Sequence, residues 1–141
     1  TDGEAGLIGI VIVAHGGLAR EYLAAVEHVV GPQPNLAAIA IAPEDDREDK
    51  QCEICAVADQ VDSGDGVVVV TDLFGGSPSN LSLRACAPIN RRILYGANLP
   101  MLIKLAKSRH LSVGEAVRQA MEAGRKYINS QNVNPDAGQA S

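Results

Sequence analysis

Two glycine-rich segments contain the most reactive side chains of the sequence. The first reads Ala-His-Gly-Gly-Leu at residues 14–18, and the second reads Asp-Leu-Phe-Gly-Gly-Ser-Pro-Ser-Asn at residues 72–80. A neutral imidazole has one nitrogen that donates and one that accepts a hydrogen bond. A carboxylate that holds the N–H therefore leaves the other nitrogen free as a nucleophile. The sequence thus predicts nucleophilic chemistry at His15, with Asp72 orienting the ring, if the fold brings the two segments together.

The same segments predict an anion site. Paired glycines let the backbone come close to a ligand, and each pair leads into a predicted helix whose free N–H groups attract an anion. Ser77 adds a hydroxyl and is predicted to cap its helix, with Pro78 at the first helical position. A phosphoryl group on His15 would lie against these donors. The residues predicted to bind it are Gly16, Gly17, Gly75, Gly76 and Ser77.

Each of these residues also has a purely structural interpretation. A histidine after a strand usually makes structural contacts, paired glycines usually form a tight turn, and an aspartate there commonly starts a turn or caps a helix. The functional hypothesis therefore depends on their convergence in space, which the arrangement of strands decides.

The other reactive side chains fit structural roles better. His28 falls inside a predicted helix beside apolar neighbours, and His110 follows a helix, where a cation suits the dipole. Cys52 and Cys55 have redox-motif spacing, but they lie in mid-helix, whereas a thioredoxin-type motif opens a helix. Cys55 is predicted to border the apolar side of that helix, and Cys52 to point away. No zinc-ligand spacing and no nucleotide-binding glycine motif occurs, so no metal or nucleotide site is expected.

Strands and helices are predicted to alternate along the chain. Short segments rich in Val and Ile predict buried strands at residues 7–14, 36–42, 66–71 and 92–97. Apolar periods and start signals predict helices at residues 18–30, 77–87, about 100–108 and 112–128. A further helix, which includes Cys52, has its apolar period at residues 54–61. The last helix begins with a predicted capping box of Ser112 and Glu115.

This alternation predicts an α/β fold: a single-domain, doubly wound, mainly parallel sheet with helices on both faces. The expected strand order is 2-1-3-4, which makes the first and third strands neighbours. Ligand sites in such sheets lie beyond the carboxyl ends of the strands, where the winding reverses. His15 and Asp72 are therefore predicted to meet there. Residues 1–6 and 131–141 are predicted to be flexible tails around a domain at residues 7–130.

Composition narrows the classes of function. The chain has 141 residues, of which 12 are Lys or Arg and 17 are Asp or Glu, so its net charge is −5. This balance argues against nucleic-acid binding, which needs a basic face. The apolar runs are too short for direct membrane insertion, and no secretory leader is recognised. Three cysteines do not form a disulfide framework, so a reducing cytoplasm is the expected location.

At the two glycine-rich segments the sequence resembles the mannose-type enzyme IIA component of the bacterial sugar phosphotransferase system. Residues 9–19 (GIVIVAHGGLA) and 72–80 (DLFGGSPSN) carry the resemblance, and residues 98–102 (NLPML) match a third segment of that family. Order and spacing agree from about residue 7 to residue 128. The Gly-Gly-Ser-Pro loop argues against the family's dihydroxyacetone-kinase branch.

The resemblance implies that His15 accepts a phosphoryl group on Nε2 from the phosphohistidine of the carrier protein HPr and passes it to a IIB component. Asp72 would hold the other ring nitrogen, and Ser77 with the backbone of Gly75 and Gly76 would contact the phosphoryl oxygens. The resemblance also implies a homodimer whose sheet is completed by exchanged C-terminal elements, and no metal or organic cofactor. Because no IIB domain is recognised, the IIB component is expected to be a separate chain.

Two other functions stay open at this level. The phosphohistidine could act as a charge switch that controls binding to a target protein, without sugar transport. A histidine phosphatase or mutase also uses a histidine at the end of a strand, but it needs an arginine beside that histidine, and here the preceding residue is Ala14. The leading hypothesis is a phosphotransferase that serves sugar uptake.

Overall fold

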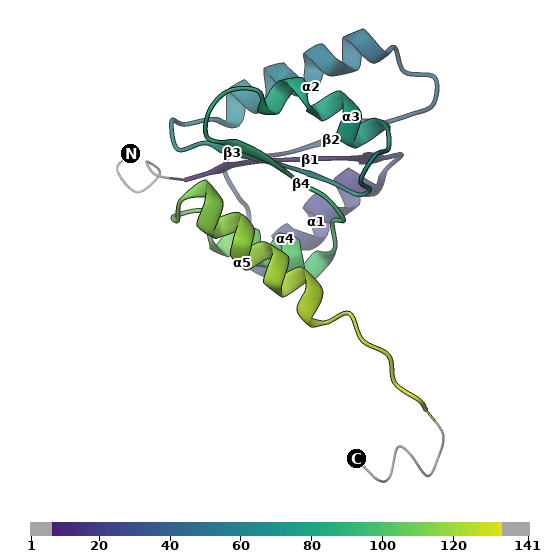
Figure 1. The fold of residues 1–141 in the computed structure, drawn as a ribbon, viewed down its shortest axis with the longest axis vertical. Coiled ribbons are helices and arrows are strands. Elements are labelled where there is room, and N and C mark those ends of the chain that lie inside the picture. The colour runs from purple at the N-terminus through teal and green to yellow at the C-terminus, as the bar shows by residue number, and fades with distance from the viewer. Residues whose placement is uncertain (1–6, 134–141) are drawn as a thin grey trace.

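The structure is a computed structural model that describes residues 7–133, and it confirms the predicted alternation of strands and helices (Figure 1). The strands are β1 (Gly9–His15), β2 (Leu36–Ile41), β3 (Val67–Thr71) and β4 (Arg91–Leu94). The helices are α1 (Leu18–Val30), α2 (Arg47–Val61), α3 (Ser77–Ser82), α4 (Leu99–Lys107) and α5 (Val113–Lys126), and a 3-10 turn, η1, spans Arg84–Cys86.

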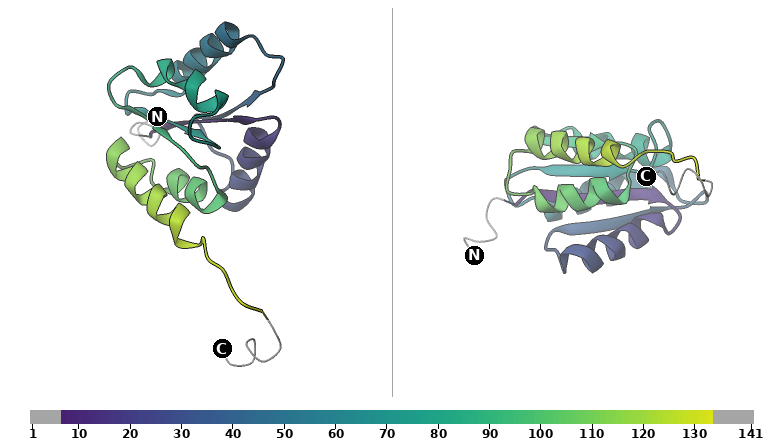
Figure 2. Two further views of the ribbon diagram at one scale, coloured as in Figure 1. Left: turned by 45° about the vertical axis from the view of Figure 1, so that its right-hand side comes forward. Right: turned by 90° about the horizontal axis from the view of Figure 1, so that it is seen from below.

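The strands form one parallel sheet in the order β2-β1-β3-β4, as the sequence predicts. Helices α2 and α3 cover one face, and α1, α4 and α5 cover the other, as Figure 1 and the left view of Figure 2 show; the right view of Figure 2 looks onto the layer of α1, α4 and α5. Every residue of β3 is buried, and so is every residue of β1 before His15. Parallel strands that helices cover on both faces meet no water, which is why these segments are almost uniformly apolar.

Side chains of β1 alternate between the two layers of helices. Ile10 and Ile12 pack in a core with α1, α4 and α5, whereas Val11 and Val13 pack in a second core with α2 and α3. This two-residue period is the normal geometry of a strand. The alternation fixes the direction of every side chain along β1, including the residue at its end.

Several element boundaries differ from the sequence prediction, most of them by one or two residues. Strand β4 ends at Leu94, because the chain then turns through Gly96, which has a φ of +78°. Helix α3 ends at Ser82 and is followed by η1. The Ser82 hydroxyl donates a hydrogen bond to the carbonyl of Pro78 at 2.6 Å, and such a bond competes with the backbone hydrogen bonds of a regular helix. Helix α5 ends at Lys126, two residues before the predicted end.

Buried Arg109 fixes the start of the central strand. Its Nε donates to the carbonyl of Ile8 at 2.7 Å, and its Nη2 donates to the carbonyl of Asn35 at 3.1 Å. Burial lowers the pKa of this guanidinium. Two charge-assisted bonds to backbone carbonyls hold the beginnings of β1 and β2 against the loop that precedes α5. The carboxyl ends of these strands are thereby held in register at the opposite edge.

After α5 the chain leaves the body of the molecule (Figure 1). Residues 131–133 form neither helix nor strand, and the rest of the predicted tails, residues 1–6 and 134–141, lies outside the described residues. Strand β4 pairs with β3 alone within the described sheet, so one of its edges is open there. No helix in residues 7–133 is long and apolar enough to cross a membrane.

Candidate functional site

His15 and Asp72 meet at the carboxyl edge of the sheet. His15 is the last residue of β1, and Asp72 directly follows β3, the neighbouring strand. The His15 Nδ1 lies 2.8 Å from the Asp72 Oδ2, and the backbone N–H of His15 donates to the same oxygen at 3.1 Å. The structure therefore brings together the two residues that the sequence singles out.

The Asp72 carboxylate is a buried, ionised partner for the ring. Its side chain is 10% exposed, against 49% for His15. Burial opposes ionisation, but the hydrogen bonds from the His15 ring and backbone outweigh it, so the pKa of Asp72 is lowered. A carboxylate accepts but does not donate when ionised, so the proton in this contact belongs to Nδ1. The arrangement leaves Nε2 with its lone pair.

The free edge of the ring faces the start of α3. A Cβ placed on Gly76 would lie 3.4 Å from the His15 Cε1 and 3.8 Å from its Nε2. A side chain at residue 76 would therefore occupy the space beside the nucleophilic nitrogen. The lack of one leaves room for a group bound to Nε2.

Ser77 does not cap α3, which corrects the sequence prediction. Gly76 is the N-cap residue and makes no side-chain cap bond, so Ser77 is the first helical residue and Pro78 the second. The cause is Ser79, whose hydroxyl accepts from the N–H of Gly75 at 2.9 Å and donates to the carbonyl of Gly76 at 3.0 Å. Ser77 is exposed, and its hydroxyl is not required by the helix. Sequence analysis missed Ser79, whose only signal is its place two residues after Ser77.

Glycines 16 and 17 form the turn between β1 and α1. Gly16 has a φ of +56°, a conformation that other residues rarely adopt, and its N–H donates to the carbonyl of Ile41 at 2.8 Å. Gly17 is the N-cap residue of α1, without a side-chain cap. The turn therefore sets His15 beside the end of β2 and starts α1 next to it. The N–H of Gly16 is already engaged in this arrangement.

A hollow of about 630 Å³ opens beside His15 on the side of α2 and α3. Its walls come from the end of β2, the start of α2 and the start of α3. The lining residues are His15, Gly16, Ile41, Ala42, Pro43, Asp45, Arg47, Ser77 and Leu81. Asp45 and Arg47 belong to a third segment that sequence analysis did not assign to the site. The carboxyl end of β2 lies at the same edge as that of β1, and this topology was their only signal.

Large apolar side chains are exposed around the same edge. Phe74 is 80% exposed, and its ring packs edge-on against Tyr95 with ring centres 4.9 Å apart. Leu73, next to it, and Leu18, at the start of α1, are also exposed. Exposed apolar groups beside a reactive residue are typical of a surface that docks another protein. The reactive imidazole therefore lies on a surface that suits a macromolecular partner.

The remaining reactive side chains lie away from this edge or in structural settings. His28 and His110 are exposed, in the last turn of α1 and after α4. Cys52 is exposed and Cys55 is half-buried, as predicted. Burial raises the pKa of Cys55 and raises that of Cys86 to about 11, so these thiols stay protonated near neutral pH. Within residues 7–133 no group of three or more His, Cys, Asp and Glu side chains is placed to hold a metal ion.

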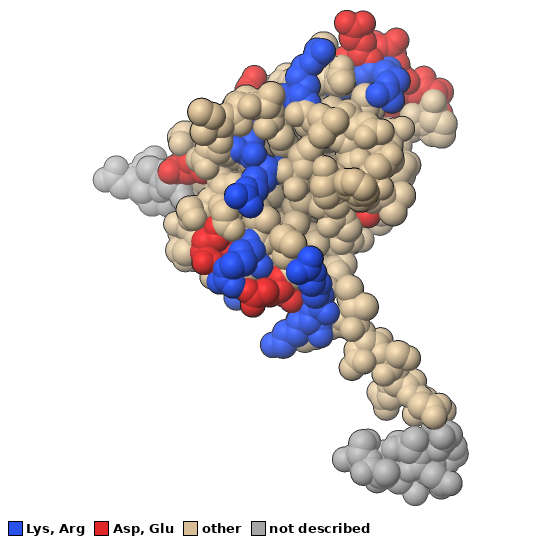
Figure 3. All heavy atoms as spheres, viewed as in Figure 1, with Lys and Arg blue, Asp and Glu red and all other residues tan. Residues whose placement is uncertain are grey.

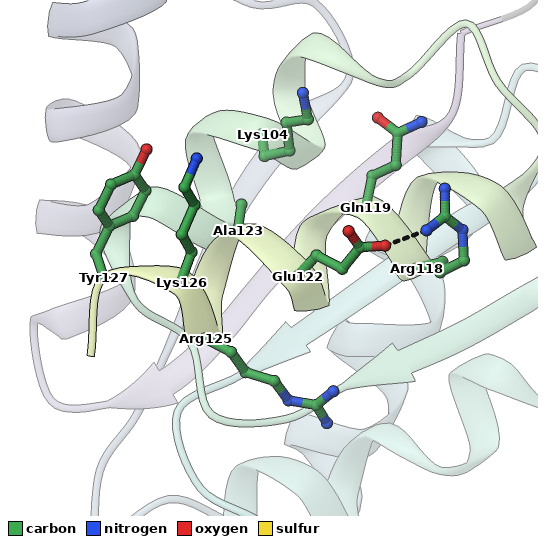
Figure 4. Close-up of a pocket in the computed structure, with 8 residues that line it drawn as sticks. All are labelled: Lys104, Arg118, Gln119, Glu122, Ala123, Arg125, Lys126 and Tyr127. Carbon is green, nitrogen blue, oxygen red and sulfur yellow. Dashed lines mark hydrogen bonds and ion pairs between the residues drawn. The ribbon is translucent and has the colours of Figure 1, made fainter. Parts of the chain in front are cut away.

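A second hollow, of about 670 Å³, lies between α4 and α5 on the opposite face of the sheet (Figure 4). Charged side chains surround it, among them Lys104 and Arg125, and Figure 3 shows basic and acidic side chains next to each other over this part of the surface. Arg118 on its rim is paired with Glu115 and Glu122. The hollow offers neither an oriented nucleophile nor a buried acid among its lining residues, so the candidate site is the one at His15.

Comparison with known proteins agrees with this geometry. A family model described as "PTS system fructose IIA component" matches residues 9–122. The chain is 30% identical over 131 residues to the PTS system mannose-specific EIIAB component of Escherichia coli (strain K12), and this match covers 91% of the chain and 41% of that relative. It is 26% identical over 123 residues to the PTS system sorbose-specific EIIA component of Lacticaseibacillus casei, and this match covers 86% of the chain and 88% of that relative.

Solved structures give the same result. The mannose/sorbose specific IIA subunit from Enterococcus faecalis has a TM-score of 0.80 and 25% identity, covering 91% of this chain and 97% of that one. The EIIA component from Streptococcus agalactiae has a TM-score of 0.77 and 27% identity, and the match covers 88% of this chain and 97% of that one. The chain spans about two fifths of the two-part EIIAB relatives and nearly the whole of single IIA proteins. Because the family model covers most of its length, the chain belongs to the mannose-type IIA family of sugar phosphotransferase system components.

Proposed function

We propose that the chain is a phosphoryl carrier that accepts a phosphoryl group on His15 and passes it on for sugar uptake. The observation that carries the proposal is the 2.8 Å contact between His15 Nδ1 and the Asp72 carboxylate. This contact keeps the proton on Nδ1 and the lone pair on Nε2, beside the space that Gly76 leaves open. Relatives named as mannose- and sorbose-specific components support the role in sugar phosphotransfer.

In the proposed step, the His15 Nε2 attacks the phosphorus of a phosphohistidine on the carrier protein HPr. The N–P bond of the donor breaks as the new N–P bond forms, and the electron pair of the broken bond stays on the donor nitrogen. The Nδ1 proton stays between the ring and Asp72, whose carboxylate stabilises the positive charge that the ring gains. A second such step hands the phosphoryl group to a IIB component.

Positioning and charge carry most of the catalysis in such a transfer, since the phosphoryl group passes between two nitrogens with its charge spread over three oxygens. The exposed hydroxyl of Ser77 is the donor we assign to these oxygens, together with backbone N–H groups at Gly76 and Ser77. The exposed apolar side chains of Phe74, Leu73 and Leu18 would contact HPr and IIB. In this role the protein acts in the cytoplasm and meets the membrane through its partners.

A homodimer with exchanged C-terminal elements is part of the proposal. Strand β4 leaves an open edge in the described sheet, and an open edge is a template for another strand. The chain after α5 runs away from the body, and Ile128 and Val133 expose their side chains there. We expect sedimentation equilibrium to give twice the chain mass of 14.7 kDa. A monomer at tens of micromolar would contradict the exchange.

The central test is phosphorylation by the donor cascade. The protein is incubated with phosphoenolpyruvate, enzyme I and HPr from the same organism, and we expect one phosphate per chain that is labile in acid and stable in base. Peptide mapping by mass spectrometry should place it on the peptide that contains His15. Leaving out HPr should abolish the labelling. If HPr becomes phosphorylated while this protein takes up no phosphate, the proposed function is wrong.

A further inference from the structure

One wall of the hollow beside His15 carries a cationic side chain that the proposed mechanism has not yet used. Arg47 is the first residue of α2 and is exposed, and it lines the hollow together with His15 and Ser77. The free edge of the His15 ring faces the start of α3, which forms another wall of the same hollow. A phosphoryl group on Nε2 would therefore lie between the start of α3 and the start of α2.

Three charged side chains near Arg47 already have partners. The Asp45 carboxylate accepts from the N–H of Ala42 at 2.7 Å and lies 3.9 Å from the Lys50 Nζ, and Lys50 pairs with Glu53 at 2.8 Å. Asp46 accepts from a backbone N–H as the cap of α2. The side chain of Arg47, by contrast, makes no ion pair or hydrogen bond with any residue in 7–133.

A cation in the hollow would stabilise a phosphoryl group on His15, because the nearby side chains are mostly acidic. A phosphoryl group brings close to two negative charges near neutral pH. Asp72 already lies behind the ring, and acidic side chains gather at the start of α2, which Figure 3 shows at the upper right. These carboxylates disfavour a second anion in the hollow. A guanidinium offers a planar fork of donors that matches phosphoryl oxygens, and no other Lys or Arg lines this hollow.

We propose that Arg47 binds the phosphoryl oxygens on His15 and so stabilises the phosphorylated protein relative to the free one. This inference rests on the proposed function and adds a residue to it. Arg47 differs from the donors at α3 because it supplies a full charge from a separate element. Because the side chain is exposed, the contact should have the strength of a surface ion pair, up to about fivefold in an equilibrium constant.

The test measures the equilibrium of phosphoryl exchange between phospho-HPr and this protein. We expect Arg47→Gln to shift the equilibrium about fivefold toward phospho-HPr and Arg47→Lys to shift it less, since lysine keeps the charge. A residue that only docks HPr would change the rate of exchange but not the equilibrium between the free proteins. The matched control is Arg125→Gln, an exposed arginine on α5 at the opposite face of the sheet, which should behave as wild type.

The outcomes separate this inference from the proposed function. An equilibrium constant for Arg47→Gln equal to that of wild type overturns the role of Arg47, whatever happens to the rate, and leaves His15 as the acceptor. A wild-type protein that takes up no phosphate from phospho-HPr overturns both. Since Arg47 is exposed at the first position of a helix, neither variant removes a packed side chain, and circular dichroism will confirm that both are folded.

Discussion

A His15→Ala variant is expected to accept no phosphoryl group from phospho-HPr, a loss of more than about a thousandfold in labelling rate. The imidazole combines an oriented ring with an open nitrogen: Nδ1 is held at 2.8 Å by Asp72, and Nε2 borders the space beside Gly76. The alanine side chain has no lone pair to attack phosphorus. Time-resolved labelling with phospho-HPr measures the effect.

The other two histidines supply matched controls. His28 and His110 are exposed, so His28→Ala and His110→Ala remove an imidazole without touching the candidate site. Both variants should label at the wild-type rate. His15→Ala should still fold, but it leaves the Asp72 carboxylate without the ring N–H, so its unfolding temperature should be lower than that of wild type. Labelling of His15→Ala as fast as wild type would show that the phosphoryl group goes elsewhere.

An Asp72→Asn variant is expected to keep the fold and to slow phosphoryl transfer by about a hundredfold. An amide can occupy the same space, but it carries no charge to offset the ring as it becomes cationic. An amide can also donate to Nδ1, which would move the proton to Nε2 and remove the nucleophilic lone pair. Stopped-flow transfer from phospho-HPr measures the rate. The control is Asp65→Asn, because Asp65 precedes β3 and so lies at the end of that strand opposite to Asp72. Unchanged kinetics for Asp72→Asn would contradict the role of the carboxylate.

The pH dependence of stability gives the same variant a second readout. The pKa of Asp72 lies below its ordinary value of 3.8, so its ionised form is favoured by folding. Such a contribution is present above the unfolded pKa and is lost as pH falls through the folded pKa. The free energy of unfolding of wild type should therefore exceed that of Asp72→Asn at neutral pH, and the difference should shrink as the pH falls below 3.8.

The sequence contains enough information for the sheet and for the central pair of the site. Uniformly apolar strands with helices between them predict a parallel, doubly wound sheet. Right-handed crossovers limit its topology, and 2-1-3-4 is the order expected for a sheet of this size. Once β1 and β3 are neighbours, the residues after them must meet. The meeting of His15 and Asp72 is thus a consequence of topology, and the structure shows it as a direct hydrogen bond.

Details that depend on local competition between hydrogen bonds were not predictable in this way. Ser77 has the residue type of a cap, but the hydroxyl of Ser79 takes the backbone groups of the turn and makes Gly76 the N-cap. Arg47 has no motif around it and reaches the site because β2 ends at the same edge as β1. Sequence patterns report which elements form, whereas such contacts depend on how neighbouring loops pack.

The alternation of side chains along β1 makes the length of this strand a functional property. His15 continues the odd-numbered series of Val11 and Val13, which face α2 and α3, and so it shares a side with the hollow. Deleting one residue within β1 would leave the His-Gly-Gly motif intact yet turn the imidazole toward the layer of α1. The motif would still be recognised in such a chain. The histidine side chain, however, would lie on the other face of the sheet and point away from its aspartate.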